Sequence, residues 1–219
     1  MGLSGTLRPV GVMLYCLSLS SMEFQHDASW AALTSILESR LTAKESWSRL
    51  IDFHEQSVSK EYWQLLRDLD IDAEQKDFVS WFGLLVRENP LPETVMALWI
   101  GILKFAGEGK EIPTIYLAGS EYFDKEDIDW VCEPAYLPVN KYAQPEVLSQ
   151  IDAIAKTDED NYGFIDWIFP LAYCAFMIDE IMRTKLDKGS FLGSVVKLHV
   201  AVGHDGGDFI VLSDVARED

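Results

Sequence analysis

The residues best suited to chemistry lie near the carboxyl end of the chain. His204, Asp205 and Asp208 stand between two runs of strand-forming residues. A histidine and two carboxylates could ligate a metal ion or exchange protons with a substrate. Aspartate and glycine are also the usual residues of tight turns. Because His199 and His204 are an odd number of positions apart, they should face opposite sides of a regular strand. The pattern therefore predicts a hairpin turn, with a metal or acid–base site as the alternative.

A second candidate is the acidic stretch of residues 121–130. It places four carboxylates within six positions: Asp124, Glu126, Asp127 and Asp129. Clustered carboxylates bind calcium or magnesium, and a bound metal ion can activate water. However, no glycine stands where a calcium loop needs its sharp turn. We interpret the stretch as a solvated acidic loop or edge, with metal binding as the alternative.

Residues 158–165 come close to a calcium-binding loop but lack its decisive ligand. Asp158, Asp160 and Gly163 match the first, third and sixth positions of such a loop. Phe169 stands at the twelfth position, where a bidentate glutamate is required. We interpret the segment as an acidic loop before a helix, where carboxylates favour the positive end of the helix dipole.

No other motif in the sequence specifies a reaction or a cofactor. Gly119-Ser120 lacks the glycine spacing of a hydrolase nucleophile, and no glycine-rich phosphate loop occurs. The three cysteines, Cys16, Cys132 and Cys174, are far apart and form no metal-binding pair. Since no cofactor-binding motif occurs, we expect no cofactor. Such sparse cysteines are typical of a reducing compartment, so we expect a cytoplasmic location.

The elements that would position these residues begin with helices. From residue 27 to residue 105 the apolar residues recur at a helical period. Thr42 and Glu45 form a capping-box pattern, and Asp72 with Gln75 suggests a second cap. We expect five helices, whose apolar stripes begin at Trp30, Trp47, Tyr62, Phe78 and Val95. The fifth would run from about residue 92 to residue 105, with Leu98, Trp99, Ile102 and Phe105 on its inner face.

The pattern changes after residue 107. Residues 112–118 and 196–202 read as strands, residues 130–137 as a further possible strand, and residues 209–212 as the second strand of the hairpin. Helices are expected after Pro145 and over residues 170–184, the latter central because it is apolar nearly all round. The fold class is α+β, with a helical amino-terminal half packed on a small, mostly antiparallel carboxyl-terminal sheet. The expected core includes Trp81, Phe82, Trp99, Ile102, Phe176 and Val200.

We divide the chain into two parts. Residues 1–21 form an extension that resembles a signal peptide, with an apolar stretch after Arg8, or else reflects a start assigned upstream of Met22. An export signal would make the protein exported rather than cytoplasmic. Residues 22–219 form one globular α+β domain. No other segment is apolar enough to span a membrane.

The net charge of the chain limits the classes of partner that it is expected to bind. The 36 acidic and 18 basic residues give a net charge of -18. Residues 111–219 carry 21 acidic and 8 basic residues, so most of the excess lies in the second half. Such a field repels nucleic acid and anionic membranes and favours a basic protein partner. In size, acidity and richness in aromatic residues, the chain resembles bacterial immunity proteins that neutralise toxins, although no motif carries that resemblance.

We therefore expect a non-enzymatic, acidic protein-binding domain. Its expected partner-binding residues combine carboxylates with aromatic anchors, and they are Tyr122, Phe123, Asp124, Glu126, Asp127, Asp129 and Trp130. The alternative is a metal-dependent hydrolase that uses carboxylates of the 124–129 segment together with His204, Asp205 and Asp208 of the 204–208 hairpin.

Overall fold

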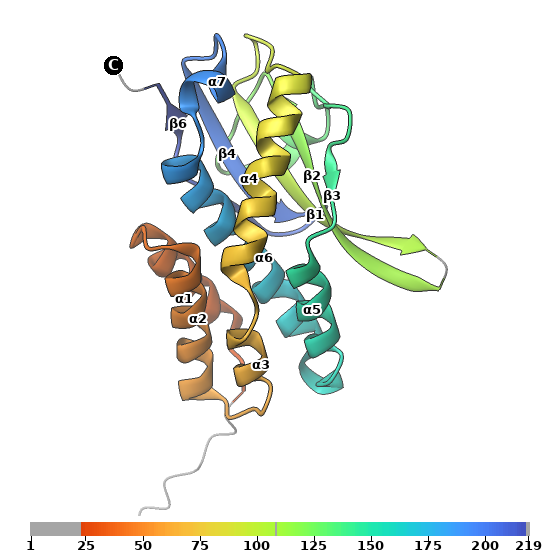
Figure 1. The fold of residues 1–219 in the computed structure, drawn as a ribbon. Coiled ribbons are helices and arrows are strands. Elements are labelled where there is room, and N and C mark those ends of the chain that lie inside the picture. The colour runs from red at the N-terminus through yellow and green to blue at the C-terminus, as the bar shows by residue number, and fades with distance from the viewer. Residues whose placement is uncertain (1–22, 108, 218–219) are drawn as a thin grey trace, which may run out of the picture.

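The chain folds into a group of helices packed on one face of a mixed sheet (Figure 1). This computed structural model describes residues 23–107 and 109–217, so the expectation for residues 1–21 lies outside the described residues. The α-helices are α1 (His26–Glu38), α2 (Ala43–Ser57), α3 (Trp63–Arg67), α4 (Ile71–Glu88), α5 (Glu146–Ala155), α6 (Tyr162–Glu180) and α7 (Lys188–Leu192). Shorter helical turns are η1 (Ile128–Val131), η2 (Glu159–Asn161) and η3 (Ile181–Lys185).

The sheet is mostly antiparallel. Its strands are β1 (Ala97–Gly107), β2 (Lys110–Ser120), β3 (Tyr142–Ala143), β4 (Lys197–His204), β5 (Phe209–Val211) and β6 (Val215–Ala216). They lie in the order β3-β2-β1-β4-β5, and β6 pairs with the beginning of β4. Only the central pair of β1 and β4 is parallel among these strands. The predicted α+β class, with helices first and a small sheet later, is confirmed.

Local sequence signals explain where the early helices begin. The predicted capping box of α2 is confirmed: the Glu45 amide donates to Thr42 Oγ1, and the Thr42 amide donates to Glu45 Oε2, both at 3.2 Å. The cap predicted at Asp72 is wrong by two positions. Asp70 caps α4 by accepting from the Ala73 amide at 3.0 Å, and Asp72 lies in the first turn, where its charge suits the helix dipole.

The helix predicted for residues 92–105 is wrong, because most of this segment is strand β1. The same residues that satisfy a helical period also satisfy alternation, with Leu98, Ile100 and Ile102 on one face and Trp99 on the other. Pairing decides between the two: β1 pairs with β2 along its whole length and with β4 from Ala97 to Ile102. These ladders satisfy the backbone hydrogen bonds that a helix would have made internally.

The strand predicted for residues 130–137 is also wrong. The segment contains the end of η1 and then a single bridge between Tyr136 and Gly119 of β2. Acidic side chains explain this local geometry, since Asp127 Oδ1 accepts from the Asp129 amide at 2.9 Å and caps the short helix η1.

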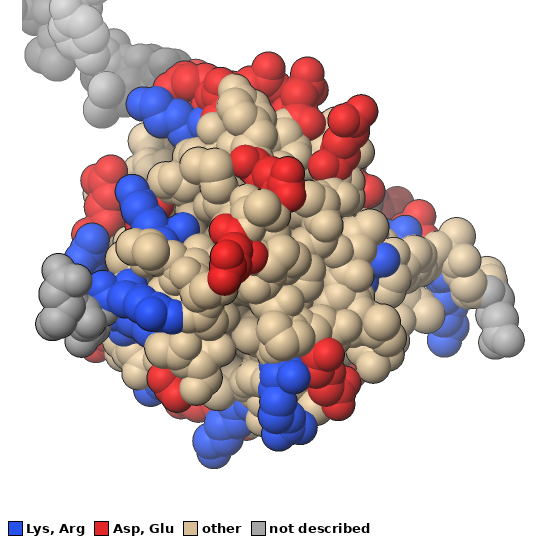
Figure 2. All heavy atoms as spheres, turned by 90° about the horizontal axis from the view of Figure 1, so that it is seen from above, with Lys and Arg blue, Asp and Glu red and all other residues tan. Residues whose placement is uncertain are grey.

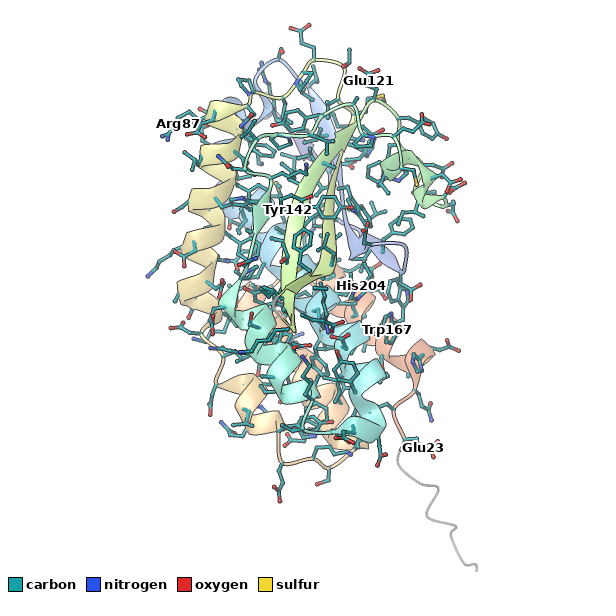
Figure 3. All side chains as sticks on the ribbon, turned by 90° about the vertical axis from the view of Figure 1, so that its right-hand side faces the viewer. Glu23, Arg87, Glu121, Tyr142, Trp167 and His204 are labelled. Atoms are coloured by element: carbon teal, nitrogen blue, oxygen red, sulfur yellow. The ribbon has the colours of Figure 1, made fainter. Side chains whose placement is uncertain are left out.

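The two faces of the sheet differ in what covers them. The larger core joins one face to α2, α4, α5 and α6, and Phe82, Ile102, Phe176 and Val200 are buried in it as predicted. Trp81 is only partly buried at its edge. The other face carries a smaller cluster around Trp99 and Trp130. In Figure 3, α4 lies on one side of the sheet and the chain around η1 lies on the other.

Helix α6 runs through the middle of the larger core, as its apolar sequence predicts. It begins at Tyr162, well before the predicted residue 170, and therefore carries Pro170 inside it. A proline has no amide hydrogen, so it cannot donate to the carbonyl oxygen four residues earlier. No helix among the described residues has the length and apolar character needed to cross a membrane.

The hairpin of β4 and β5 is confirmed. The two strands pair antiparallel from Ala201 to Gly203, and Gly206 in the turn has a φ of 76°. A positive φ is readily adopted only by glycine, which explains the glycines of this turn. The β1–β2 hairpin, in contrast, extends well beyond the rest of the sheet (Figure 1).

Candidate functional site

The predicted acidic segment follows β2 and lies against the sheet face opposite the helices. We define the acidic segment as residues 121–133, which carry the carboxylates of Glu121, Asp124, Glu126, Asp127, Asp129 and Glu133. Glu126, Asp127 and Asp129 are exposed, while Asp124 is partly buried. Asp124 Oδ1 accepts from the Glu126 amide at 2.8 Å, so it stabilises a turn within the segment.

Two of the predicted aromatic anchors hold this segment in place. Trp130 is only 4% exposed and packs edge-on against Trp99 and Phe123. Phe123 stacks on the ring of His199 with centroids 4.2 Å apart. Trp130 is therefore unsuitable as a surface anchor, because a partner could not reach it without opening this cluster. The sequence did not reveal this burial, because the contact joins Trp130 to Trp99 of β1, about thirty residues earlier in the chain.

Tyr122 is the aromatic residue that the segment exposes. It is 60% exposed, and its hydroxyl donates to Asp124 Oδ2 at 3.3 Å. The negative charge of Asp124 raises the pKa of Tyr122, so the phenol stays neutral near pH 7. Tyr122 can thus offer both an apolar ring and a hydroxyl to a partner.

An ion cluster fixes the sheet beneath the acidic segment. Asp214 accepts from Lys197 and lies 2.7 Å from His199 Nδ1. Burial opposes ionisation of Asp214, but the hydrogen bonds from Lys197 and His199 outweigh it and lower its pKa. Since His199 also stacks on Phe123, this cluster links the acidic segment to β4 and β6.

Exposed apolar side chains gather at the same end of the sheet. We name this end the loop end and define it by the exposed residues Met96, Tyr122, Leu137, Val139 and Val196 together with the acidic segment. Backbone contacts join its parts: Met96 bonds to Ser120 and His199, and Tyr136 bonds to Gly119. Figure 2, seen from above Figure 1, shows acidic residues gathered along one edge of this face and, beside them, a mostly uncharged surface with isolated carboxylates in it.

The hairpin residues predicted as the alternative site bond to other residues and not to one another: His204 and Asp208 bond to Trp167, and Asp205 bonds to Tyr116. His204 Nε2 lies 2.8 Å from the Trp167 carbonyl oxygen, Asp205 accepts from the Tyr116 hydroxyl at 2.9 Å, and Asp208 accepts from Trp167 Nε1 at 2.9 Å. His199 and His204 have different surroundings, as their odd spacing predicted. Within the described ranges, no group of three His, Cys, Asp or Glu residues could hold a metal ion.

The acidic segment and this hairpin lie at opposite ends of the sheet. Ser120, just before the segment, pairs with Ala97, whereas His204 pairs with Ile102. Five strand positions correspond to about 17 Å. Figure 3 shows the same separation between Glu121 and His204. A hydrolase site built from both sets of carboxylates is therefore not favoured by the geometry.

A pocket of about 380 Å³ opens beside the hairpin, at the carboxyl end of β4 and the middle of β1. Its lining combines apolar and charged residues, namely Ile102, Leu103, Lys104, Pro113, Leu148, Asp152, Asp166, Pro170, His204 and Asp205. This is the size of pocket that holds small ligands. The sequence did not reveal this pocket, because Lys104 was expected on a helix, and the buried Asp152 and partly buried Asp166 were not recognised as its partners.

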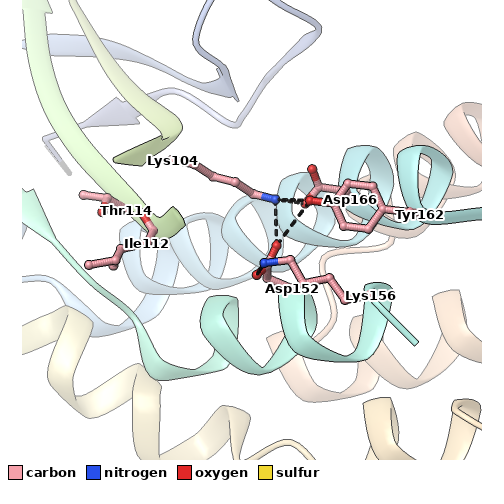
Figure 4. A network of polar contacts seen from close by, with 7 residues as sticks. All are labelled: Lys104, Ile112, Thr114, Asp152, Lys156, Tyr162 and Asp166. Atoms are coloured by element: carbon pink, nitrogen blue, oxygen red, sulfur yellow. Dashed lines mark hydrogen bonds and ion pairs between the residues drawn. The ribbon is translucent and has the colours of Figure 1, made fainter. Parts of the chain in front are cut away.

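Lys104 organises the charges of this pocket. Its Nζ lies 2.7 Å from Asp152, 2.6 Å from Asp166 and 2.7 Å from the Tyr162 hydroxyl (Figure 4). Burial opposes the positive charge, but hydrogen bonds to the two carboxylates outweigh it and raise the pKa of Lys104. Burial likewise opposes ionisation of Asp152, and Lys104 and Lys156 nevertheless lower its pKa. The sequence feature that could have indicated this charged cluster is Lys104 itself, a single lysine within an apolar run.

Comparisons with protein-family models, curated proteins and solved structures return no match for this chain. Its function must therefore be argued from its own surfaces and pockets.

Proposed function

We propose that the protein is an acidic, non-enzymatic binding domain that docks a basic protein partner on its loop end. The observation that carries this proposal is the group of exposed apolar side chains beside the acidic segment. Val139 and Val196 are 69% and 74% exposed, and Tyr122 is 60% exposed. Apolar residues exposed together commonly mark an interaction surface.

The arrangement of charge supports a basic partner. Interfaces typically have an apolar centre and a polar rim, and the acidic segment supplies such a rim along one edge. Lys125 is the single basic residue among positions 121–133. Negative charge at the rim would steer a basic partner during encounter, and the apolar centre would supply contact area.

A toxin-neutralising role of the immunity type is one role that such a surface would serve. A basic toxin would be attracted by the net charge of -18 and held at the apolar centre. The charges of the acidic segment require no bound cofactor to act in this way.

Charge reversal tests the proposal. A partner captured from the native organism should bind Glu126→Lys/Asp129→Lys with an association rate reduced about tenfold at low salt. The reduction should shrink as salt rises, because charges more than about 8 Å apart are screened at physiological ionic strength. Stopped-flow mixing at several salt concentrations measures both effects.

Glu61→Lys is the matched control for the single variant Glu126→Lys, because both change the net charge equally and Glu61 is exposed just before α3, at the end of the molecule away from the loop end. It should slow association by less than about twofold, because the net charge changes but the local rim does not. Equal slowing by the two kinds of variant would show that only the net charge matters and would contradict the proposed surface.

A further inference from the structure

The pocket beside the 204–208 hairpin contains one cationic side chain, Lys104, and all of its hydrogen-bond donors already have acceptors. The ammonium group of Lys104 has three hydrogens, and three acceptors surround it: Asp152, Tyr162 and Asp166. Figure 4 shows these groups converging on Lys104 from α5 and α6. Lys104 therefore has no donor left for an anionic ligand, although it is the only lysine or arginine among the residues that line this pocket.

The same pocket is rich in acceptors that lack a donor. The Trp167 carbonyl can only accept, so His204 must carry its hydrogen on Nε2, and in the neutral ring Nδ1 is then an acceptor. Asp205 uses Oδ1 for Tyr116, and Asp166 uses Oδ1 for Lys104. Within the described part of the chain, no hydrogen-bond donor contacts Asp205 Oδ2, Asp166 Oδ2 or His204 Nδ1.

The backbone adds one more acceptor at the pocket wall. Pro170 and Asp166 both line the pocket and lie four residues apart in α6. Because Pro170 has no amide hydrogen, the Asp166 carbonyl oxygen lacks the donor that a regular helix would supply. Asp166 and His204 are partly exposed and Asp205 is exposed, so solvent can reach these acceptors in the free protein, and a cationic ligand could replace that solvent with charge-assisted hydrogen bonds.

The spacing of these acceptors favours an organic cation over a metal ion. No group of three His, Cys, Asp or Glu residues within the described ranges is arranged to hold a metal ion. An ammonium or guanidinium group on a carbon chain can reach separated acceptors. The apolar part of the lining, which includes Ile102, Pro113 and Leu148, would contact that chain.

We propose that this pocket binds a small free alkyl amine, with its cationic head at Asp166, His204 and Asp205 and its carbon chain against the apolar wall. The pocket lies at the carboxyl end of β4 and beside the middle of β1, between the sheet and helices α5 and α6. This site is separate from the loop end, so the two proposals stand or fall independently.

Calorimetric titration of the full chain with cadaverine and agmatine tests this proposal. We expect saturable one-site binding, and Asp205→Asn should weaken it about tenfold or more, because one charge-assisted hydrogen bond is lost. The asparagine can still accept from Tyr116, so the hairpin is retained. Asp208→Asn is the matched control: it removes the same charge from the same hairpin, away from the pocket lining, and should change affinity less than twofold.

Pro113→Trp provides a second variant that acts through volume, not charge, since Pro113 pairs with Lys104 of β1 and so lies on the sheet face that borders the pocket. An indole at this wall position would occupy part of the cavity and should abolish binding of both amines while the melting curve stays cooperative.

Four results would overturn the proposal. The first would be that neither amine binds below about 10 mM. The second would be that Asp205→Asn and Asp208→Asn weaken amine binding equally, which would indicate only non-specific attraction. A third contradicting result would be that butyrate or Mg²⁺ binds in this pocket and the amines do not. The fourth would be that Nα-acetyl-lysine methylamide binds more tightly than cadaverine, which would assign the pocket to a lysine side chain of a protein partner.

Discussion

Lys104 is the residue that joins the sheet to α5 and α6 through charge. Its replacement by methionine leaves the partly buried Asp166 without its cation and the buried Asp152 with Lys156 as its remaining cation. Breaking such a pair strands an uncompensated charge, so we expect Lys104→Met to lower the free energy of unfolding by about 2–3 kcal/mol at pH 7. Urea unfolding followed by tryptophan fluorescence measures the change.

The pH dependence of that loss follows from the pKa of Asp152. In the wild type this pKa lies below its usual value of 3.8, so ionised Asp152 contributes stability above about pH 4 and loses it as pH falls through the lowered pKa. Without Lys104 the pKa rises, and protonation relieves the stranded charge earlier. The difference between wild type and Lys104→Met should therefore shrink from pH 7 to pH 4.5.

Lys44→Met is the matched control for this pair of predictions. Lys44 pairs with Asp72 at 2.6 Å, but both side chains are more than 60% exposed. Such an exposed pair contributes little, so the loss should be close to zero at both pH values. If the loss for Lys104→Met were as small, or stayed constant with pH, the assigned role of Lys104 would be wrong.

Trp99 tests the smaller cluster on the other sheet face. It is 1% exposed and packs against Trp130 and Phe209. Trp99→Ala should cost about 3–5 kcal/mol, because a large buried ring leaves a cavity. Trp81, only partly buried, should cost less when replaced by alanine. A loss below 1 kcal/mol for Trp99→Ala in chemical denaturation would contradict this packing.

Among the elements, those with local signals were predicted best from the sequence. The capping box of Thr42 and Glu45 located α2, and the glycines after Val202 located the β4–β5 hairpin. Strand β1 was not predicted, because the spacing of Leu98 and Ile102 fits both the helical period and the alternation of a strand. Its pairing with β4, about a hundred residues later, is invisible to a local pattern. The pocket was missed for the same reason, since its walls come from β1, α5, α6 and the hairpin.

The outer half of the β1–β2 hairpin should be dispensable for stability. Beyond Ile102, β1 has no partner other than β2, and both Phe105 and Ile112 are exposed. Replacing residues 106–111 by Asn-Gly should change the free energy of unfolding by less than about 1 kcal/mol, because few buried contacts are lost.

Gly101→Ala at the base of this hairpin is the contrasting variant. An added Cβ would lie 2.1 Å from the Tyr116 ring, so a cost of about 1–3 kcal/mol is expected. A larger loss for the shortened hairpin than for Gly101→Ala in urea unfolding would show that the outer half of the hairpin is structural.

At the scale of the whole molecule, the fold separates two kinds of surface. The helices cover one face of the sheet, and the acidic segment covers part of the other through Phe123 and Trp130. The loop end retains exposed apolar residues beside carboxylates, while the pocket lies towards the other end of the sheet. The sequence predicted the acidic character of the first surface but not its apolar centre, which is assembled from four separate loops.

The apolar centre of the loop end is the central claim, and one binding measurement tests it most directly. A partner captured by the wild-type chain would be titrated against Val139→Ser/Val196→Ser and against Leu65→Ser, whose leucine is 53% exposed on α3. The account predicts that the double variant binds at least about tenfold more weakly while Leu65→Ser binds like the wild type, because only the former loses interface contacts. Unchanged affinity of the double variant, or equal weakening by Leu65→Ser, would contradict it.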